Sequence, residues 1–166
     1  MKFPFFKKKQ DDKGASDEIE ALRRSLLKSP DNIRLHIRIA EACMAKGMKN
    51  EAIEEYSNAA KAYQRKNLIP IAVALYKQVI EINPELYDVF ENVADIQIQH
   101  GFVGDGVATL ETLSLKLFEK GMKERAFDVI AKIRSIDPEN RIFNQKASKL
   151  FEKIRSAAPA DKDKWT

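Results

Sequence analysis

The sequence is poor in cysteine, histidine and long apolar runs, and each shortage excludes a class of protein. Its 166 residues include one cysteine, Cys43, and two histidines. A single cysteine cannot form an internal disulfide, and these three residues are too few for a zinc site of the usual kind. No apolar run approaches the roughly 20 residues that a helix needs to cross a bilayer. We therefore expect a protein of the reducing cytoplasm.

The N-terminus lacks the long apolar segment of a secretory signal, because its phenylalanines are followed at once by three lysines. The net charge is +4, of which residues 1–13 supply +3, from five lysines and two aspartates. A nucleic-acid-binding surface needs a concentrated stripe of lysine and arginine to neutralise phosphates. Since the remainder of the chain is nearly neutral, we predict no nucleic-acid partner.

What the sequence does contain is an internal repeat without gaps. Three X-Pro pairs mark the repeat, ending at Pro30, Pro84 and Pro138. The intervals between them (84 − 30 and 138 − 84) are equal and define a 54-residue period. The same shift places Gly47 on Gly101, Asn67 on Gly121, Ala40 on Ala94 and Ala72 on Ala126. A period in this range is typical of solenoids built from repeated supersecondary units. Such proteins usually bind other proteins rather than catalyse reactions.

Helix signals are dense, whereas strand signals are almost absent. Glycine or asparagine follows several helical runs, where a left-handed C-cap residue is favoured. The X-Pro pairs end other runs, since the residue before proline is disfavoured in the α region. Eight helices are predicted, over residues 16–28, 32–46, 49–65, 69–82, 86–99, 104–119, 122–136 and 140–155. We expect one helical domain over residues 16–156, with tails at 1–15 and 157–166.

Several copies of one motif resemble the tetratricopeptide repeat (TPR). The first copy contains Ile39-Ala40, Cys43, Gly47, Ala52, Tyr56 and Ala59, and further copies extend the resemblance over residues 16–155. The resemblance implies an all-α fold, a right-handed TPR-like α-α superhelix of about eight antiparallel stacked helices. It also implies an adaptor or scaffold that binds a peptide or helix of a partner protein. The period departs from the family because it holds three helices instead of two, which leaves open which helices line the groove.

Three patterns that suggest an enzyme have simpler structural interpretations. The glycines of residues 101–106 follow a helix and lack the lysine of a phosphate-binding loop, so we predict a C-cap and a close helix contact. His36 and Cys43 occupy positions of large core residues in the motif and are predicted to pack. Glu54 and Glu55 are predicted to lie on a solvated helical face, without surroundings that would tune a pKa. We predict no enzymatic activity, no cofactor and no metal.

The TPR resemblance implies that a partner meets the exposed faces of the first helices of the motif. The candidate partner-binding residues are Arg34, Arg38, Glu41, Asp88, Glu91, Asn92 and Asp95, joined by Asn58, Lys61 and Arg65 if helix 49–65 faces inward. This set is basic at one end and acidic toward the middle, a polarity that can orient a charged peptide. For each residue the alternative is plain solvation. The family's carboxylate clamp is not reproduced, because Ile37 and Glu41 stand where its lysine and asparagine would be.

The N-terminal tail is a second candidate docking segment. It combines aromatic and basic residues, Phe3, Phe5, Phe6, Lys7, Lys8 and Lys9. Such a segment can contact anionic lipid, with each lysine contributing about 1 kcal/mol, although one weak anchor attaches only reversibly. Docking onto a partner and simple solubility are the alternatives.

The leading hypothesis is therefore a cytoplasmic adaptor. Its competitors are a factor at the inner face of the membrane, serving assembly or targeting in a secretion, pilus or motility system, and a chaperone for a secreted protein. The sequence leaves the identity of the partner and the oligomeric state open.

Overall fold

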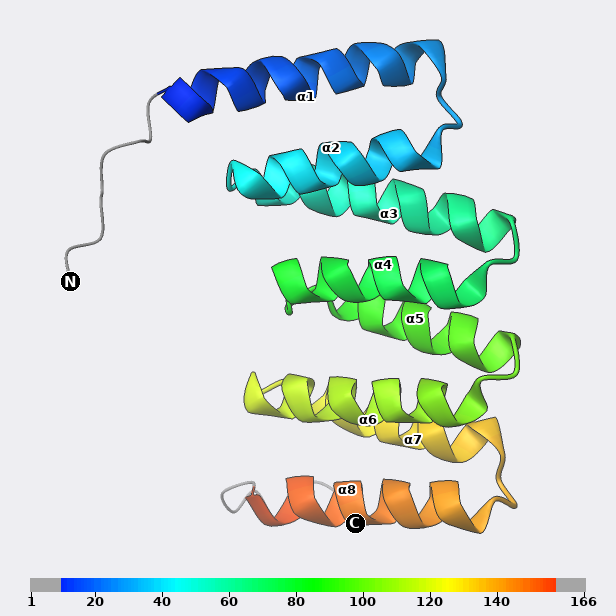
Figure 1. Ribbon diagram of the computed structural model, residues 1–166. Coiled ribbons are helices and arrows are strands. Elements are labelled where there is room, and N and C mark those ends of the chain that lie inside the picture. The colour runs from blue at the N-terminus through cyan, green and yellow to red at the C-terminus, as the bar shows by residue number, and fades with distance from the viewer. Residues whose placement is uncertain (1–9, 158–166) are drawn as a thin grey trace, which may run out of the picture. The chain divides into compact units, whose positions relative to one another are not determined.

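The computed structural model describes residues 10–157, and all regular structure in this range is helical (Figure 1). The helices are α1 (Gln10–Lys28), α2 (Ile33–Ala45), α3 (Lys49–Arg65), α4 (Ile69–Ile82), α5 (Tyr87–Gln99), α6 (Val103–Glu119), α7 (Lys123–Ile136) and α8 (Arg141–Ala157). The fold is all-α, as predicted. The chain groups into two compact units, with the boundary between Leu86 and Tyr87. The N-terminal unit holds α1–α4 and the C-terminal unit holds α5–α8.

The 54-residue repeat is reproduced in the bounds of the helices. Both ends of α2, α3 and α4 recur one period later as the ends of α5, α6 and α7, and α8 begins where the next copy of α2 would begin. The predicted helices therefore agree with the observed ones to within a few residues, except at the N-terminus. There α1 begins at Gln10, ahead of the predicted start at residue 16.

The turns repeat together with the helices. Gly47 and Gly101 follow α2 and α5 with φ angles of 73° and 85°, and Asn67 follows α3 with a φ of 56°. After α2, the N–H of Met48 donates to the carbonyl oxygen of Cys43 at 2.9 Å. This bond closes the helix end in the manner of a Schellman motif, for which a left-handed residue is needed. The predicted C-caps at these positions are confirmed.

Each unit is built from helices that pack in chain order and alternate in direction (Figure 1). Alanines at the contacts have no exposed surface, which allows the helix axes to approach closely; among them are Ala40, Ala52, Ala59, Ala72, Ala94 and Ala126. Burial of the apolar stripe of one helix against the next is what stabilises repeat proteins. In this fold no helix buries its own stripe alone.

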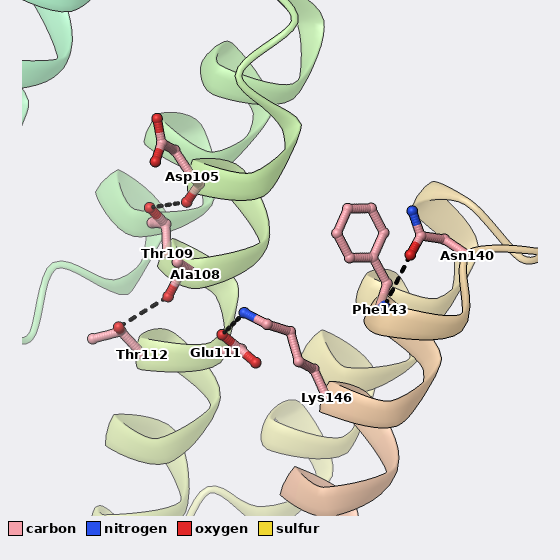
Figure 2. A network of polar contacts seen from close by, with 8 residues as sticks. All are labelled: Asp105, Ala108, Thr109, Glu111, Thr112, Asn140, Phe143 and Lys146. Atoms are coloured by element: carbon pink, nitrogen blue, oxygen red, sulfur yellow. Dashed lines mark hydrogen bonds and ion pairs between the residues drawn. The ribbon is translucent and has the colours of Figure 1, made fainter.

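The C-terminal unit forms two layers, because helices two apart in the chain are also neighbours. Helix α6 packs against α8 as well as against α5 and α7. Lys146 Nζ of α8 lies 2.9 Å from Glu111 Oε2 of α6 (Figure 2). Side chains of α7 similarly reach α5, so α5 and α7 lie in one layer and α6 and α8 in the other. The start of α8 is capped by Asn140 Oδ1, which accepts hydrogen bonds from the N–H groups of Ile142 and Phe143.

Candidate functional site

A hollow of about 430 Å³ lies in the N-terminal unit, where the start of α2 meets the end of α3. Because α2 and α3 run in opposite directions, the loop before α2 and the last turn of α3 come to the same end of the unit (Figure 1). The lining comes from this loop, the first turn of α2 and the C-terminal part of α3, and consists of Pro30, Asp31, Ile33, His36, Asn58, Lys61, Ala62, Arg65 and Lys66. The structure thus brings together three of the predicted partner-binding residues.

The hollow is rich in positive charge. Lys61 and Arg65 lie four residues apart on α3, so their side chains share one face of the helix. Both are exposed, as is Lys66. No carboxylate of residues 16–157 forms an ion pair with Lys61 or Arg65. The acidic residue in the lining is Asp31, so cations outnumber anions at this site.

One wall of the hollow contains a polar pair between α2 and α3. His36 Nδ1 lies 2.6 Å from Glu55 Oε2, and the two side chains are only 16% and 15% exposed. The prediction that Glu55 lies on a solvated face is therefore wrong. Glu55 lies three residues after Ala52 and four before Ala59, both fully buried, which places it at the edge of the buried stripe. That spacing was the sequence signal for this contact.

Cys43 is in the core, as predicted, with no exposed surface. Burial raises the pKa of its thiol, and the charge of Arg23 opposes this effect only in part. A thiol that stays protonated is a poor nucleophile. The chemistry of Cys43 is therefore that of a packing residue.

The other predicted residues of α2 do not line the hollow. Arg34, Arg38 and Glu41 are exposed, and Arg38 Nη2 lies 3.8 Å from Glu18 Oε1 of α1. Both partners of that pair are more than half exposed, so it contributes little to stability. Whether these three residues meet a partner stays a prediction.

The predicted acidic residues of α5 are engaged by α7 within the C-terminal unit. Arg125 Nη2 lies 3.1 Å from Glu91 Oε1 and 3.6 Å from Asp88 Oδ1, and Lys132 Nζ lies 2.7 Å from Asp95 Oδ1. Sequence reasoning missed these pairs because the partners are far apart along the chain. Asn92 is exposed. Since the acidic and basic sets belong to different units, a groove shared between them stays a prediction.

The docking residues predicted in the N-terminal tail, Phe3, Phe5, Phe6, Lys7, Lys8 and Lys9, lie outside the described residues. Within residues 10–157 no helix is both long enough and apolar enough to cross a membrane. Among the side chains of residues 16–157, no three of the metal-ligating types gather into a potential ion site.

Comparisons with known proteins give no family assignment. No family model matches the chain, and no curated protein matches it. A solved structure titled "Crystal structure of MamA" is 18% identical, covers 94% of this chain and 95% of that chain, and has a TM-score of 0.41. A second, titled "Crystal structure of MamA protein", is 16% identical over 92% of this chain and 91% of that chain, with a TM-score of 0.28. Similarity at this level does not bear on function.

Proposed function

We propose that this protein is a protein-interaction scaffold and that a partner docks at the hollow between α2 and α3. The observation that carries the proposal is the pair Lys61 and Arg65, exposed beside a hollow with no carboxylate of residues 16–157 paired to them. The packed helices fix the backbone that carries these cations. Most of the ordering cost of binding then falls on the partner, which favours recognition of a flexible segment.

The same site offers little to a catalytic mechanism. His36 forms a hydrogen bond with Glu55 and could serve as a base. Nucleophilic catalysis would also require a nucleophile within hydrogen-bond reach of this base. The cysteine of the chain is buried in the core. We therefore propose binding, not catalysis, as the activity of this site.

Charge reversal on α3 tests this function. The full-length protein, the variant carrying both Lys61→Glu and Arg65→Glu, and the control Lys77→Glu would be used for quantitative affinity capture from the native organism. Lys77 is exposed on α4 and does not line the hollow. We expect a set of proteins retained by the native chain and by the control but lost with the double variant. Recovery of the same proteins with all three baits would reject the docking site.

A second candidate function is reversible attachment to an anionic membrane through residues 3–9, favoured by their phenylalanines and consecutive lysines. This role would suit an assembly or targeting factor. Co-sedimentation with phosphatidylserine vesicles should decrease when residues 1–9 are removed, whereas phosphatidylcholine vesicles should bind neither form. Equal sedimentation of both forms with the anionic vesicles would dismiss the role of the tail.

A further inference from the structure

The spacing of the two cations on α3 restricts the ligand that both can bind. An α-helix rises 1.5 Å per residue, so Lys61 and Arg65 are separated by about 6 Å along the axis. In an extended peptide, alternate side chains point to the same side and repeat at about 6.6 Å. An extended segment lying along α3 would therefore offer one acidic side chain to each cation if its acids were two residues apart. The residue between them would point away from the helix.

The internal repeat shows that this site is not a general product of the fold. One period later in the sequence, Lys61 and Arg65 are replaced by Leu115 and Glu119, so neither cation recurs. His36 and Ala62 correspond to Phe90 and Lys116, and Lys116 Nζ lies 5.9 Å from the centre of the Phe90 ring. In the C-terminal unit a lysine thus covers the ring at this place, whereas in the N-terminal unit the small Ala62 lines open space.

Other residues of the hollow suit the backbone of an extended peptide. Asn58 lies three residues before Lys61 on α3 and contributes a carboxamide, which can both donate and accept hydrogen bonds. Ile33, Pro30 and Ala62 supply apolar surface at the same place. Asp31 is the unfavourable element, because its carboxylate would repel an acidic ligand.

We propose that the hollow binds an extended acidic segment of a partner protein in which two carboxylates are two residues apart, one at Lys61 and the other at Arg65. This inference rests on the proposed scaffold function and names the chemistry of the partner. The carboxylates are side chains within the segment, so a free C-terminus is not required. Charge-assisted hydrogen bonds from lysine and arginine to carboxylates are the strong interactions of this complex.

Fluorescence anisotropy with synthetic peptides tests the spacing. Two fluorescein-labelled, C-terminally amidated peptides of equal composition would be titrated with the full-length protein at low ionic strength. One carries Ser-Glu-Ser-Glu-Ser between glycines, and its isomer carries Ser-Ser-Glu-Glu-Ser. We expect the first to bind about tenfold more tightly, because only its two acids can reach both cations. Equal affinity for the two isomers would overturn the proposed spacing.

Variants of the hollow test the residues. Lys61→Gln and Arg65→Gln should each weaken binding of the alternating peptide about tenfold, which corresponds to the loss of one charge-assisted contact. Asp31→Asn should strengthen it, and Lys77→Gln should leave it unchanged. These glutamine substitutions replace exposed side chains, and circular dichroism would verify that the helical fold is retained. Unchanged affinity in folded Lys61→Gln and Arg65→Gln proteins would reject the site.

Two further outcomes separate this inference from the scaffold function. If neither peptide binds but the charge-reversed double variant still loses its captured proteins, the scaffold function stands and the acidic-segment assignment is wrong. If phosphatidylserine vesicles bind instead, and Lys61→Gln and Arg65→Gln weaken that binding, the hollow contacts lipid headgroups and the peptide assignment is also wrong.

Discussion

Gly106 lies where α6 approaches α5 so closely that a side chain has no room. A Cβ at this position would lie 2.5 Å from Ile98 Cγ1 and 3.0 Å from the carbonyl oxygen of Ala94. Gly106→Ala should lower the free energy of unfolding by about 1–3 kcal/mol, since the overlap must be relieved by shifts in the packing. Urea denaturation followed by far-ultraviolet circular dichroism measures this change.

Gly104 provides the matched control on the same helix. A Cβ there meets no atom within 4 Å. Gly104→Ala should leave the stability unchanged or raise it by up to about 1 kcal/mol, because alanine is the better helix former. An equal loss in both variants would show that a general effect of replacing glycine, not the contact with Ile98, is responsible. The close helix contact predicted for the glycines of residues 101–106 is confirmed, and it lies at Gly106.

The thiol of Cys43 makes the stability depend on pH in the alkaline range. Burial raises its pKa above the ordinary value of 9.0. The unfolded chain therefore loses its thiol proton at lower pH than the folded chain, and proton loss favours unfolding. The stabilising effect is complete below the pKa of the unfolded thiol, 9.0, and declines as the pH rises from there toward the higher pKa of the folded thiol. Burial also raises the pKa of Tyr56, which acts in the same direction at higher pH.

Urea denaturation between about pH 7 and pH 10 should accordingly show a falling free energy of unfolding. In Cys43→Ala the stability is expected to be lower at neutral pH, because the substitution leaves a cavity, but its decline with pH should be less steep. An identical pH dependence in the two proteins would show that other groups cause the decline.

At the scale of helices, three ion pairs join α5 to α7, which are not consecutive in the chain. The side chains of Arg125 and Glu91 are 41% and 38% exposed, so solvent screens their attraction. Arg125→Glu should destabilise the protein, since it places a third acid beside Glu91 and Asp88. Exchange of both charges, Glu91→Arg with Arg125→Glu, should recover part of the loss.

A double-mutant cycle on Glu91 and Arg125 measures this interaction directly. We expect a coupling energy of about 0.2–1 kcal/mol that decreases as salt is added. A coupling of zero at low salt would mean that the contact between α5 and α7 does not contribute to stability.

The helices and the ion pairs differ in how far the sequence could predict them. The ends of α3 and α4 follow from local signals: Gly47 and Asn67 permit left-handed turns, and the residue before Pro84 is disfavoured in a helix. The contact between Glu91 and Arg125 depends instead on how α5 and α7 are rotated against each other. That rotation results from packing of the whole unit, which the local pattern does not encode. For the same reason the acids of α5 were assigned to a partner surface.

At the scale of the whole molecule, the sequence period contains three helices, whereas the C-terminal unit has two layers. Helix α8 occupies the repeat position of α5, yet in the C-terminal unit α5 lies beside α7 and α8 lies beside α6. Equivalent helices therefore lie in opposite layers of the same unit. Their exposed residues face different surroundings, so the repeat preserves the core and the turns but not the surface. The cationic site on α3 is one such surface feature, because Leu115 and Glu119 stand at the equivalent positions of α6.

The repeat also predicts that one whole period can be removed in register. Deletion of residues 49–102 joins α2 to α6, and deletion of residues 67–120 joins α3 to α7. Each junction reproduces a turn that the chain already contains. Each new helix pair also has an equivalent in both units: the pair of α2 and α6 corresponds to α2 with α3 and to α5 with α6. Both shortened proteins should therefore stay helical and unfold cooperatively, although less stably than the full chain because fewer interfaces remain.

A deletion of residues 49–120 is the matched control. It joins α2 directly to α7, an order of repeat positions that the chain does not contain, because α7 precedes an equivalent of α2 (α8) and never follows one. We expect the two in-register deletions to give a sharp thermal transition by circular dichroism and the control to give a broad one or none. Broad transitions in all three would mean that the 54-residue period describes sequence similarity without interchangeable helix packing. Sharp transitions in all three would mean that apolar patterning alone is sufficient to form these helix pairs.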